Sequence, residues 1–295
     1  MNNMINGKVI KAISGTFYVD CGNKVYECKA RKKTRYVGSE VTVGDNVQFI
    51  MSKEGDYGSI ENVLPRRNCL IRPRISNIDR AFIVISTIPT ADLLLIDKII
   101  VNCAKEKILP FIVVNKTDLS DNNFYKEIQE SYSDVVEKIL YISTYNGNGM
   151  AELKNELIGN TSCFLGQSAV GKTSIVNFIT GNDYEIGSMS TKIARGKNTT
   201  RYSEIYTIYD NTYVVDTSGF SLLEGLDINS NDLCLYYSDL FAYSKDCRFN
   251  MCSHTTEPNC AVIQAVKEGK INNHRYERYV ALFNELRETE KNKYD

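Results

Sequence analysis

The amino-acid sequence predicts an α/β protein built in three parts, and three observations carry this prediction. Short β-rich runs separated by turn residues fill the chain up to Leu64. From residue 81 to residue 215, continuous apolar runs alternate with amphipathic helical patterns. Three cysteines and one histidine then gather between Cys247 and Cys260, near the C-terminus. The length of 295 residues agrees with two or three domains, each able to bury a core.

Composition excludes several classes of protein. Apolar residues make up 43% and charged residues 24%, with a net charge of −1, which excludes bulk disorder. There is no apolar run of about 18 residues that could span a membrane. The N-terminus lacks the pattern of a secretory signal, and nine cysteines form no even disulfide framework. We therefore expect a cytoplasmic protein with reduced thiols.

Positive charge gathers at the N-terminal end. Residues 1–75 hold 13 Lys or Arg and 7 Asp or Glu, whereas residues 76–295 hold 22 and 29. A basic module on a mildly acidic body indicates contact with a polyanion. A solvated basic face is the alternative.

An OB-type β-barrel is predicted for residues 1–70. Five strands are expected there, at residues 7–10, 16–19, 25–28, 45–50 and 59–64. The basic run 31–35 would lie on a loop beside Tyr26 and Tyr36. Basic groups next to aromatic rings suit single-stranded or looped RNA. A protein-binding barrel of the SH3 type is the competing interpretation.

A basic linker at residues 66–74 leads into the second part, residues 71–224. Strands are expected at 81–86, 110–114, 139–142, 161–165 and 212–215. Helices are expected at 93–106, 125–138, 150–158 and 174–179. Apolar strands alternating with helices predict a parallel sheet covered on both faces.

Residues 166–173 match the phosphate-binding pattern G-x-x-x-x-G-K-[ST] at every fixed position, between a predicted strand and a predicted helix. Glycines let successive N–H groups face one anion, and the helix N-terminus adds positive charge. Lys172 is expected to bridge the β- and γ-phosphates, and the Thr173 hydroxyl to ligate Mg²⁺. The other nucleotide-binding residues expected here are Gly166, Gln167, Ser168, Ala169, Val170, Gly171 and Ser174.

Asn115, Lys116, Thr117 and Asp118 follow a buried strand and form an Asn-Lys-x-Asp motif. The carboxylate of Asp118 can accept hydrogen bonds from N1–H and the amine of guanine, a bidentate contact that adenine lacks. Ligands of parallel sheets bind at this end of the strands. Ser143, after the next strand, is expected to add base contacts. Asp118 argues against the alternative of a P-loop ATPase or small-molecule kinase.

A second phosphate-side motif, Asp-x-x-Gly, begins at Asp216. Asp216 is expected to hold Mg²⁺ through water, and the Gly219 N–H to face the γ-phosphate. Thr199 and Thr200 lie between the two phosphate motifs and can order a switch loop in the triphosphate state. Common GTPases carry the phosphate loop first and the guanine-reading motif fourth. Here the guanine motif comes first, so the sequence predicts a circularly permuted P-loop GTPase domain.

A C-terminal module, residues 225–295, carries the spacing Cys247-x4-Cys252-x-His254-x5-Cys260. Three thiolates and one imidazole form a closed tetrahedral zinc set with no position for water, so the site is expected to be structural. A helix is predicted at 274–291. Its expected core face consists of Tyr276, Val280, Phe283 and either Leu286 or Arg287.

Together these motifs resemble the RsgA family of circularly permuted GTPases of small ribosomal subunit biogenesis, the YjeQ/YloQ type. Further similar stretches are residues 43–47, 72–73, 77–79, 95–98 and 257–262. The resemblance implies a cytoplasmic factor, expected to be monomeric, that binds the small (30S) ribosomal subunit and its rRNA. It implies GTP hydrolysis stimulated by that subunit, with one structural Zn²⁺ and with Mg²⁺ bound alongside GTP. A GTP-gated RNA-binding module with negligible catalysis is the alternative.

Three positions depart from the family pattern. Asn198 replaces a histidine proposed to help hydrolysis, and an amide can orient water but cannot take a proton near neutral pH. Candidate catalytic residues are therefore Asn198, Thr199, Thr200 and Lys172. Ser218 replaces a proline, which predicts a looser switch. Ala169 replaces a glycine and is expected to be tolerated with a negative φ.

Overall fold

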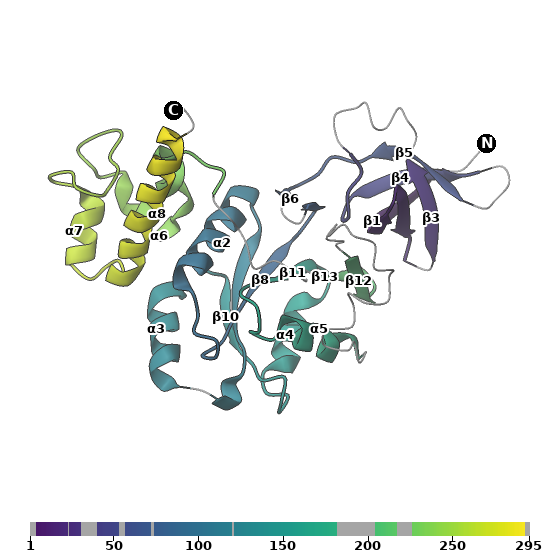
Figure 1. The fold of residues 1–295 in the computed structure, drawn as a ribbon, viewed down its shortest axis with the longest axis horizontal. Helices are drawn as coiled ribbons and strands as arrows, with labels where there is room; N and C mark the ends of the chain where they lie inside the picture. Colours follow the sequence, from purple (N-terminus) through teal and green to yellow (C-terminus); the bar gives the residue numbers. More distant parts are fainter. Residues whose placement is uncertain are drawn as a thin grey trace.

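A computed structural model describes residues 4–22, 24–30, 40–52, 57–71, 74–119, 121–181, 204–216 and 226–292. The predicted basic loop 31–35, the switch residues Asn198, Thr199 and Thr200, and Ser218 and Gly219 lie outside these residues. An N-terminal barrel and a C-terminal helical module lie on either side of a central α/β domain (Figure 1).

The barrel consists of the five predicted strands, β1 (Ile5–Ile13), β2 (Thr16–Asp20), β3 (Val25–Ala30), β4 (Asn46–Met51) and β5 (Gly58–Val63). They follow the order β1-β2-β3-β5-β4, and pairing of β1 with β4 closes the barrel. Side chains that alternate along the strands, among them Val9, Val19, Phe49 and Ile60, fill the interior and are fully buried. The predicted five-stranded barrel is confirmed.

The central sheet contains β8 (Arg80–Ile85), β9 (Leu109–Val114), β10 (Lys138–Tyr141), β11 (Thr161–Leu165) and β13 (Thr212–Asp216) in parallel, in the order β10-β9-β8-β11-β13. Helices α2 (Leu93–Glu106) and α3 (Asn122–Tyr132) pack on one face. Helices α4 (Met150–Leu157) and α5 (Lys172–Thr180) pack on the other. A 3₁₀ turn, η1 (Thr117–Leu119), follows β9. The predicted α/β domain is confirmed.

Strand β12 (Glu204–Tyr209) was not predicted, and it joins the barrel to the central sheet. It runs antiparallel to β13 and pairs with barrel strand β1 through Glu204 and Lys11. The Thr207 hydroxyl also donates to Asp20 of the barrel across 2.9 Å. The barrel and the domain therefore share one continuous sheet of 11 strands.

The segment predicted as a basic linker is instead tied into the fold. Cys69–Ile71 (β6) and Arg74–Ser76 (β7) form a hairpin. Arg66 forms an ion pair with the buried Asp45 at 2.7 Å, and Arg67 pairs with Asp79. These arginines have acidic partners, so this segment is no free linker.

The helix predicted at 125–138 ends early, and that prediction is wrong beyond residue 132. Asp121 caps the N-terminus of α3 by accepting from the Asn123 N–H. After Tyr132 the chain turns, and the Glu137 N–H donates to the Pro110 carbonyl at 2.9 Å. This hydrogen bond brings the chain onto the sheet edge, where β10 begins at Lys138.

The C-terminal module packs η2 (Ser230–Tyr236), α6 (Ser238–Ser244) and α7 (Ala261–Lys267) around the 19-residue helix α8 (Asn273–Lys291). Helix α8 buries Arg275, Tyr279, Leu282, Phe283 and Leu286. The predicted core face is thus correct at Phe283 and Leu286, whereas Tyr276 and Val280 are only partly buried. Among the described residues, no helix is both long and apolar enough to cross a membrane.

Candidate nucleotide site and metal centre

The predicted phosphate loop leaves the end of β11 and enters α5, as its sequence motif requires. Gly166 has φ +129°, and a Cβ there would lie 2.2 Å from the Val84 carbonyl oxygen, so only glycine fits. The Lys172 ammonium folds back over the loop and donates to the carbonyls of Gly166 at 2.7 Å and Gln167 at 2.5 Å. Thr173 and Ser174 stand in the first turn of α5.

Ala169 does not have the negative φ that its tolerance was expected to require. Its φ is +64°, in the left-handed region. Gly171, two residues later at the N-cap of α5, has φ +99°. A side chain in this region costs about 1–2 kcal/mol because Cβ approaches the following carbonyl oxygen. The alanine is therefore accommodated with backbone strain.

The guanine motif and the phosphate loop are joined by direct hydrogen bonds. The Asn115 side chain, buried at the end of β9, donates to the Val170 carbonyl at 2.9 Å. The Lys116 ammonium donates to the Ala169 carbonyl at 2.8 Å and to the Ile88 carbonyl at 2.7 Å. These two side chains hold the backbone of the loop in place, a role that the motif alone did not reveal.

Asp118 lies in η1, with its carboxylate exposed at the carboxyl end of the sheet. The buried Ser143 hydroxyl donates to Asp118 Oδ1 at 2.5 Å. The same oxygen of Ser143 accepts from the Tyr145 N–H at 3.2 Å. The Thr117 N–H donates to the Ile142 carbonyl at 3.1 Å, which fixes the motif against β10. Two segments predicted to contact the base are thus adjacent.

Of the predicted magnesium ligands, Thr173 is the second residue of α5 and Asp216 ends β13. Strands β11 and β13 are parallel neighbours, so both residues follow the same edge of the sheet. A hydroxyl and a carboxylate are oxygen donors of the kind that Mg²⁺ prefers.

The three cysteines and the histidine of the C-terminal module form one cluster, with ligand atoms within 4.8 Å of one another. Cys247 Sγ lies 3.7 Å from Cys260 Sγ, and His254 Nδ1 lies 3.5 Å and 3.4 Å from these two sulfurs. Tetrahedral zinc, with Zn–S of about 2.3 Å and Zn–N of about 2.0 Å, sets these separations at about 3.8 Å and 3.5 Å. The donor set therefore fits one zinc ion held by Cys247, Cys252, His254 and Cys260.

Hydrogen bonds hold the loop that carries the cluster, whereas burial by itself disfavours the thiolate form of its cysteines. Burial raises the pKa of the Cys252 thiol to about 12, because a lone thiolate is poorly solvated there. A zinc ion held by these residues would offset that cost and keep the thiolates deprotonated. The Tyr276 and Tyr279 hydroxyls donate to the carbonyls of His254 and Ser253, each at 2.9 Å, and fix the ligand loop to α8.

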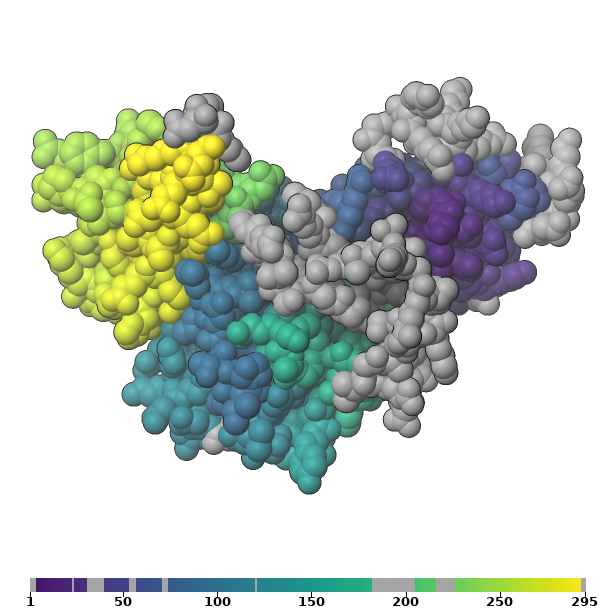
Figure 2. All heavy atoms as spheres, in the orientation of Figure 1, coloured from purple at the N-terminus to yellow at the C-terminus, as the bar shows by residue number. Residues whose placement is uncertain are grey.

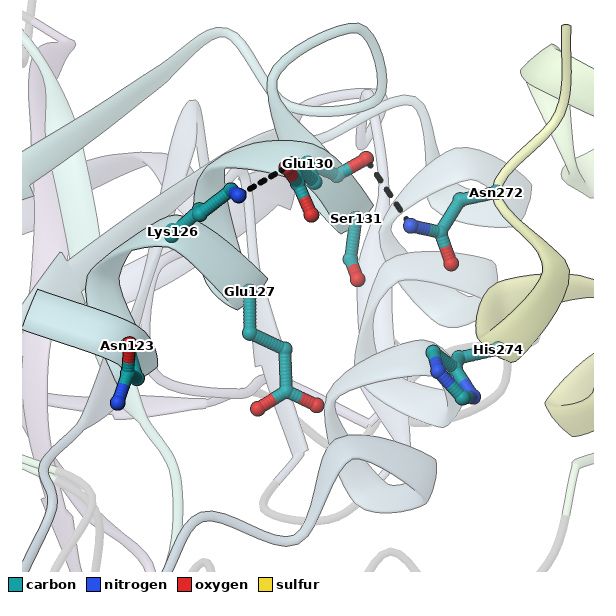
Figure 3. A pocket seen from close by; sticks show the side chains of 7 residues that line it. All are labelled: Asn123, Lys126, Glu127, Glu130, Ser131, Asn272 and His274. Carbon is teal, nitrogen blue, oxygen red and sulfur yellow. Dashed lines mark hydrogen bonds and ion pairs between the residues drawn. The ribbon is translucent and has the colours of Figure 1, made fainter. Parts of the chain in front are cut away.

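A cavity of 240 Å³ lies away from both predicted sites, between α3 and the start of α8 (Figure 3). It contains none of the residues predicted to bind nucleotide or metal. Its lining consists of Asn123, Lys126, Glu127, Glu130, Ser131, Asn272 and His274.

Comparison with known proteins gives a consistent result across the chain. Residues 63–225 match the family model of the RsgA GTPase, and residues 6–60 match that of the RsgA N-terminal domain. The small ribosomal subunit biogenesis GTPase RsgA of Ruminiclostridium cellulolyticum is 39% identical over 96% of this chain and 94% of its own length. The protein of the same name from Caldanaerobacter subterraneus is 38% identical over 98% of both chains.

Solved structures agree with the sequences. YjeQ from Thermotoga maritima superposes with a TM-score of 0.83 and 33% identity, over 96% of this chain and 99% of that one. YloQ, described as a circularly permuted GTPase, superposes with a TM-score of 0.81 and 29% identity, over 97% of this chain and 96% of that one. With the guanine motif preceding the phosphate loop on one shared sheet, the chain belongs to the RsgA family of circularly permuted GTPases.

Proposed function

We propose that this GTPase acts in the cytoplasm, as a monomer, in late maturation of the small (30S) ribosomal subunit. It binds the subunit's rRNA and hydrolyses GTP to GDP with stimulation by the subunit. The observation that carries the proposal is the direct attachment of the guanine motif to the phosphate loop, through Asn115 and Lys116. The names of the relatives, small ribosomal subunit biogenesis GTPase, supply the partner.

In this proposal, Asp118 and the Ser143 segment read guanine, and the loop from Gly166 to Ser174 wraps the phosphates. Lys172 leaves its carbonyl partners and turns to the β- and γ-phosphates. Thr173 and Asp216 hold Mg²⁺, which neutralises developing charge when bound. Phosphoryl transfer depends mainly on positioning and electrostatic stabilisation, so no strong base is required.

The three parts divide the work. Residues 1–70 bind rRNA through the basic loop 31–35, residues 71–224 bind and hydrolyse GTP, and residues 225–295 form the zinc module. The switch residues Asn198, Thr199 and Thr200 position water and the γ-phosphate. Contact of both outer parts with the subunit orders the switch and accelerates hydrolysis.

GTP turnover with purified ribosomal subunits tests the proposal. We expect at least a tenfold rate increase with small subunits and little with large ones. The increase should fall with added salt, because contacts with phosphates release counterions. Equal stimulation by both subunits would exclude the ribosomal role proposed here.

A second candidate, a GTP-gated RNA-binding module with negligible catalysis, is favoured by Asn198, which cannot act as a base. It predicts no turnover with either subunit. It also predicts co-sedimentation with small subunits that differs between GDP and a non-hydrolysable GTP analogue.

A further inference from the structure

Helix α2 contacts the phosphate loop at its N-terminal end. The Asp92 N–H donates to the side-chain oxygen of Gln167, a loop residue, at 3.0 Å. The Asp92 carboxylate in turn caps the helix by accepting from the Leu95 N–H at 3.0 Å. One side chain of the loop is therefore attached to the residue that begins α2.

One helical turn further along, α2 makes a buried ionic contact with the C-terminal module. Asp97 is fully buried and accepts from Arg275 Nη1 at 2.5 Å and from Arg278 Nε at 2.6 Å. Arg275 is only 1% exposed, and its Nε donates to Asp239 of α6 at 2.7 Å. Its guanidinium also lies over the ring of Tyr237 at 4.6 Å.

Buried charges of this kind favour one geometry. Removing them from water is costly, and the cost is offset only when every charge meets its partner. Both oxygens of the Asp97 carboxylate meet a guanidinium where α8 crosses α2, whereas Arg278 Nη2 and Asp239 Oδ1 are buried without a hydrogen-bond partner in the described part of the chain. We therefore attribute the fixed orientation of α2 and α8 to this ionic contact.

Other contacts extend the same seam. Lys98 pairs with Glu285 at 2.7 Å, and Asn272 donates to the Glu130 carbonyl at 3.4 Å, beside the cavity (Figure 3). Helices α2 and α8 are neighbours, and Figure 2 shows the yellow C-terminal part against the blue part of the central domain. Since Tyr276 and Tyr279 of α8 hold the zinc loop, hydrogen bonds and helices run without a break from the zinc cluster to the phosphate loop.

We infer that α2 is a rigid link between the zinc module and the phosphate loop, with Gln167, Asp97 and Arg275 as positioning residues for GTP hydrolysis. Asp92 and Asp97 lie five residues apart at the N-terminal end of α2, about 7.5 Å along the helix axis, so a shift of the helix at Asp97 also moves the residue that contacts Gln167. A partner bound to the zinc module would thereby act on Gly166–Lys172. The inference rests on the proposed stimulation by the small subunit.

Replacing Asp97 by Asn tests the link in the full-length protein. Asp97→Asn removes the carboxylate of α2 that pairs with Arg275 of the module. Asp239→Asn removes the other carboxylate that pairs with Arg275, which lies within the module itself. We expect Asp97→Asn to lower the ratio of stimulated to basal rate at least fivefold, with one equivalent of zinc retained. The subunit concentration for half-maximal stimulation should change less than twofold, and Asp239→Asn should keep most of the stimulation. Full stimulation of a zinc-loaded Asp97→Asn, or equal losses in both variants, would overturn the inference.

Amide hydrogen exchange provides a test that needs neither a variant nor a ribosome. Removal of zinc by a chelator should speed exchange of amides in residues 166–171, which belong to the GTPase domain and not to the module. Helix α4 (Met150–Leu157), on the opposite face of the sheet, is the internal control and should not change. Unchanged amide exchange in residues 166–171 would overturn the link. This result decides the question even if the Asp97→Asn variant loses its zinc. If small subunits do not stimulate GTP hydrolysis by the wild type, the proposed function is refuted. The hydrogen-exchange measurement then decides whether α2 links the zinc module to the phosphate loop.

Discussion

The Ser143 hydroxyl donates to Asp118 Oδ1 across 2.5 Å, and this bond joins the loop after β10 to the motif after β9. Ser143 is fully buried, whereas the Asp118 carboxylate is exposed. A buried donor therefore sets the orientation of an accessible carboxylate. In the proposed function, this orientation presents the carboxylate to the amine edge of guanine.

Asp118→Asn should weaken GTP binding and remove discrimination against xanthosine triphosphate. Xanthine carries a carbonyl where guanine carries its amine, and the amide of Asn can donate to it. Loss of a charged bidentate contact corresponds to about 2–3 kcal/mol, or roughly a hundredfold in Kd. Titration of both nucleotides checks this. Ser143→Ala is the control: it should weaken both nucleotides while keeping the preference for GTP. A variant Asp118→Asn that still prefers GTP would contradict the assigned role.

Ala169→Gly should stabilise the GTPase domain. It relieves the left-handed strain at φ +64° but adds freedom to the unfolded chain, so we expect a net gain of up to about 1 kcal/mol in the free energy of unfolding. Ala151→Gly, at an exposed position inside α4, should have the opposite sign, a loss of about 0.5–1 kcal/mol. Urea denaturation of both variants measures the difference. Equal destabilisation by both would show that Ala169 is unstrained.

The freshly purified protein should contain one equivalent of zinc. Cys252→Ser should release the metal and unfold the C-terminal module, because the metal-binding and folding free energies are coupled. The variant should still bind GTP, since the nucleotide residues lie on the central sheet. Cys21→Ser, a thiol of the barrel outside the cluster, should keep its zinc. Elemental analysis gives the content, and less than half an equivalent in the wild type would contradict the assignment.

Lys8 of the barrel should make stability depend on pH. Its ammonium donates to Thr161 at 3.1 Å, and burial lowers its pKa below the usual 10.5. Between the lowered pKa and 10.5 the unfolded chain binds more protons than the folded one, so this group adds stability as pH rises. The stability of the wild type relative to Lys8→Met should therefore increase as pH approaches 10.5. The exposed Lys24, replaced by Met, serves as the control. A pH-independent difference for Lys8→Met would contradict the linkage.

The elements with a strong local pattern were predictable. Helix α2 begins and ends at the predicted residues, because Asp92 caps it and apolar side chains recur at helical spacing. Helix α3 was predicted too long, since the signal that ends it, the bond from Glu137 to Pro110, joins distant segments. Strand β12 was missed although its main partner, β13, follows it directly: the two strands form a hairpin across Asp210 and Asn211, and Asn211 has the positive φ of such a turn. Only its pairing with β1, which joins the barrel to the sheet, connects distant segments.

The same distinction applies to the candidate sites. The zinc ligands all lie between Cys247 and Cys260, so their spacing alone predicted the cluster. The contact of Gln167 with Asp92 joins residues 75 positions apart and leaves no spacing to detect. Arg275 is a charged residue on a helix, and only the packed structure identifies its carboxylate partners, Asp97 and Asp239. Sequence motifs therefore locate the chemistry, whereas long-range packing determines how the parts are connected.

Asn198→Ala should reduce the subunit-stimulated rate at least tenfold while GTP affinity changes less than twofold. A group that orients the attacking water acts in the transition state, so its loss lowers kcat and leaves binding of the ground state unaffected. Asn198→His introduces the residue typical of the family and should retain or raise the stimulated rate, because imidazole can both orient water and accept a proton. Single-turnover hydrolysis with small subunits, together with equilibrium binding of a GTP analogue, separates the two quantities. An unchanged stimulated rate in Asn198→Ala would remove Asn198 from the mechanism and assign the acceleration to Lys172, the switch threonines and the subunit itself.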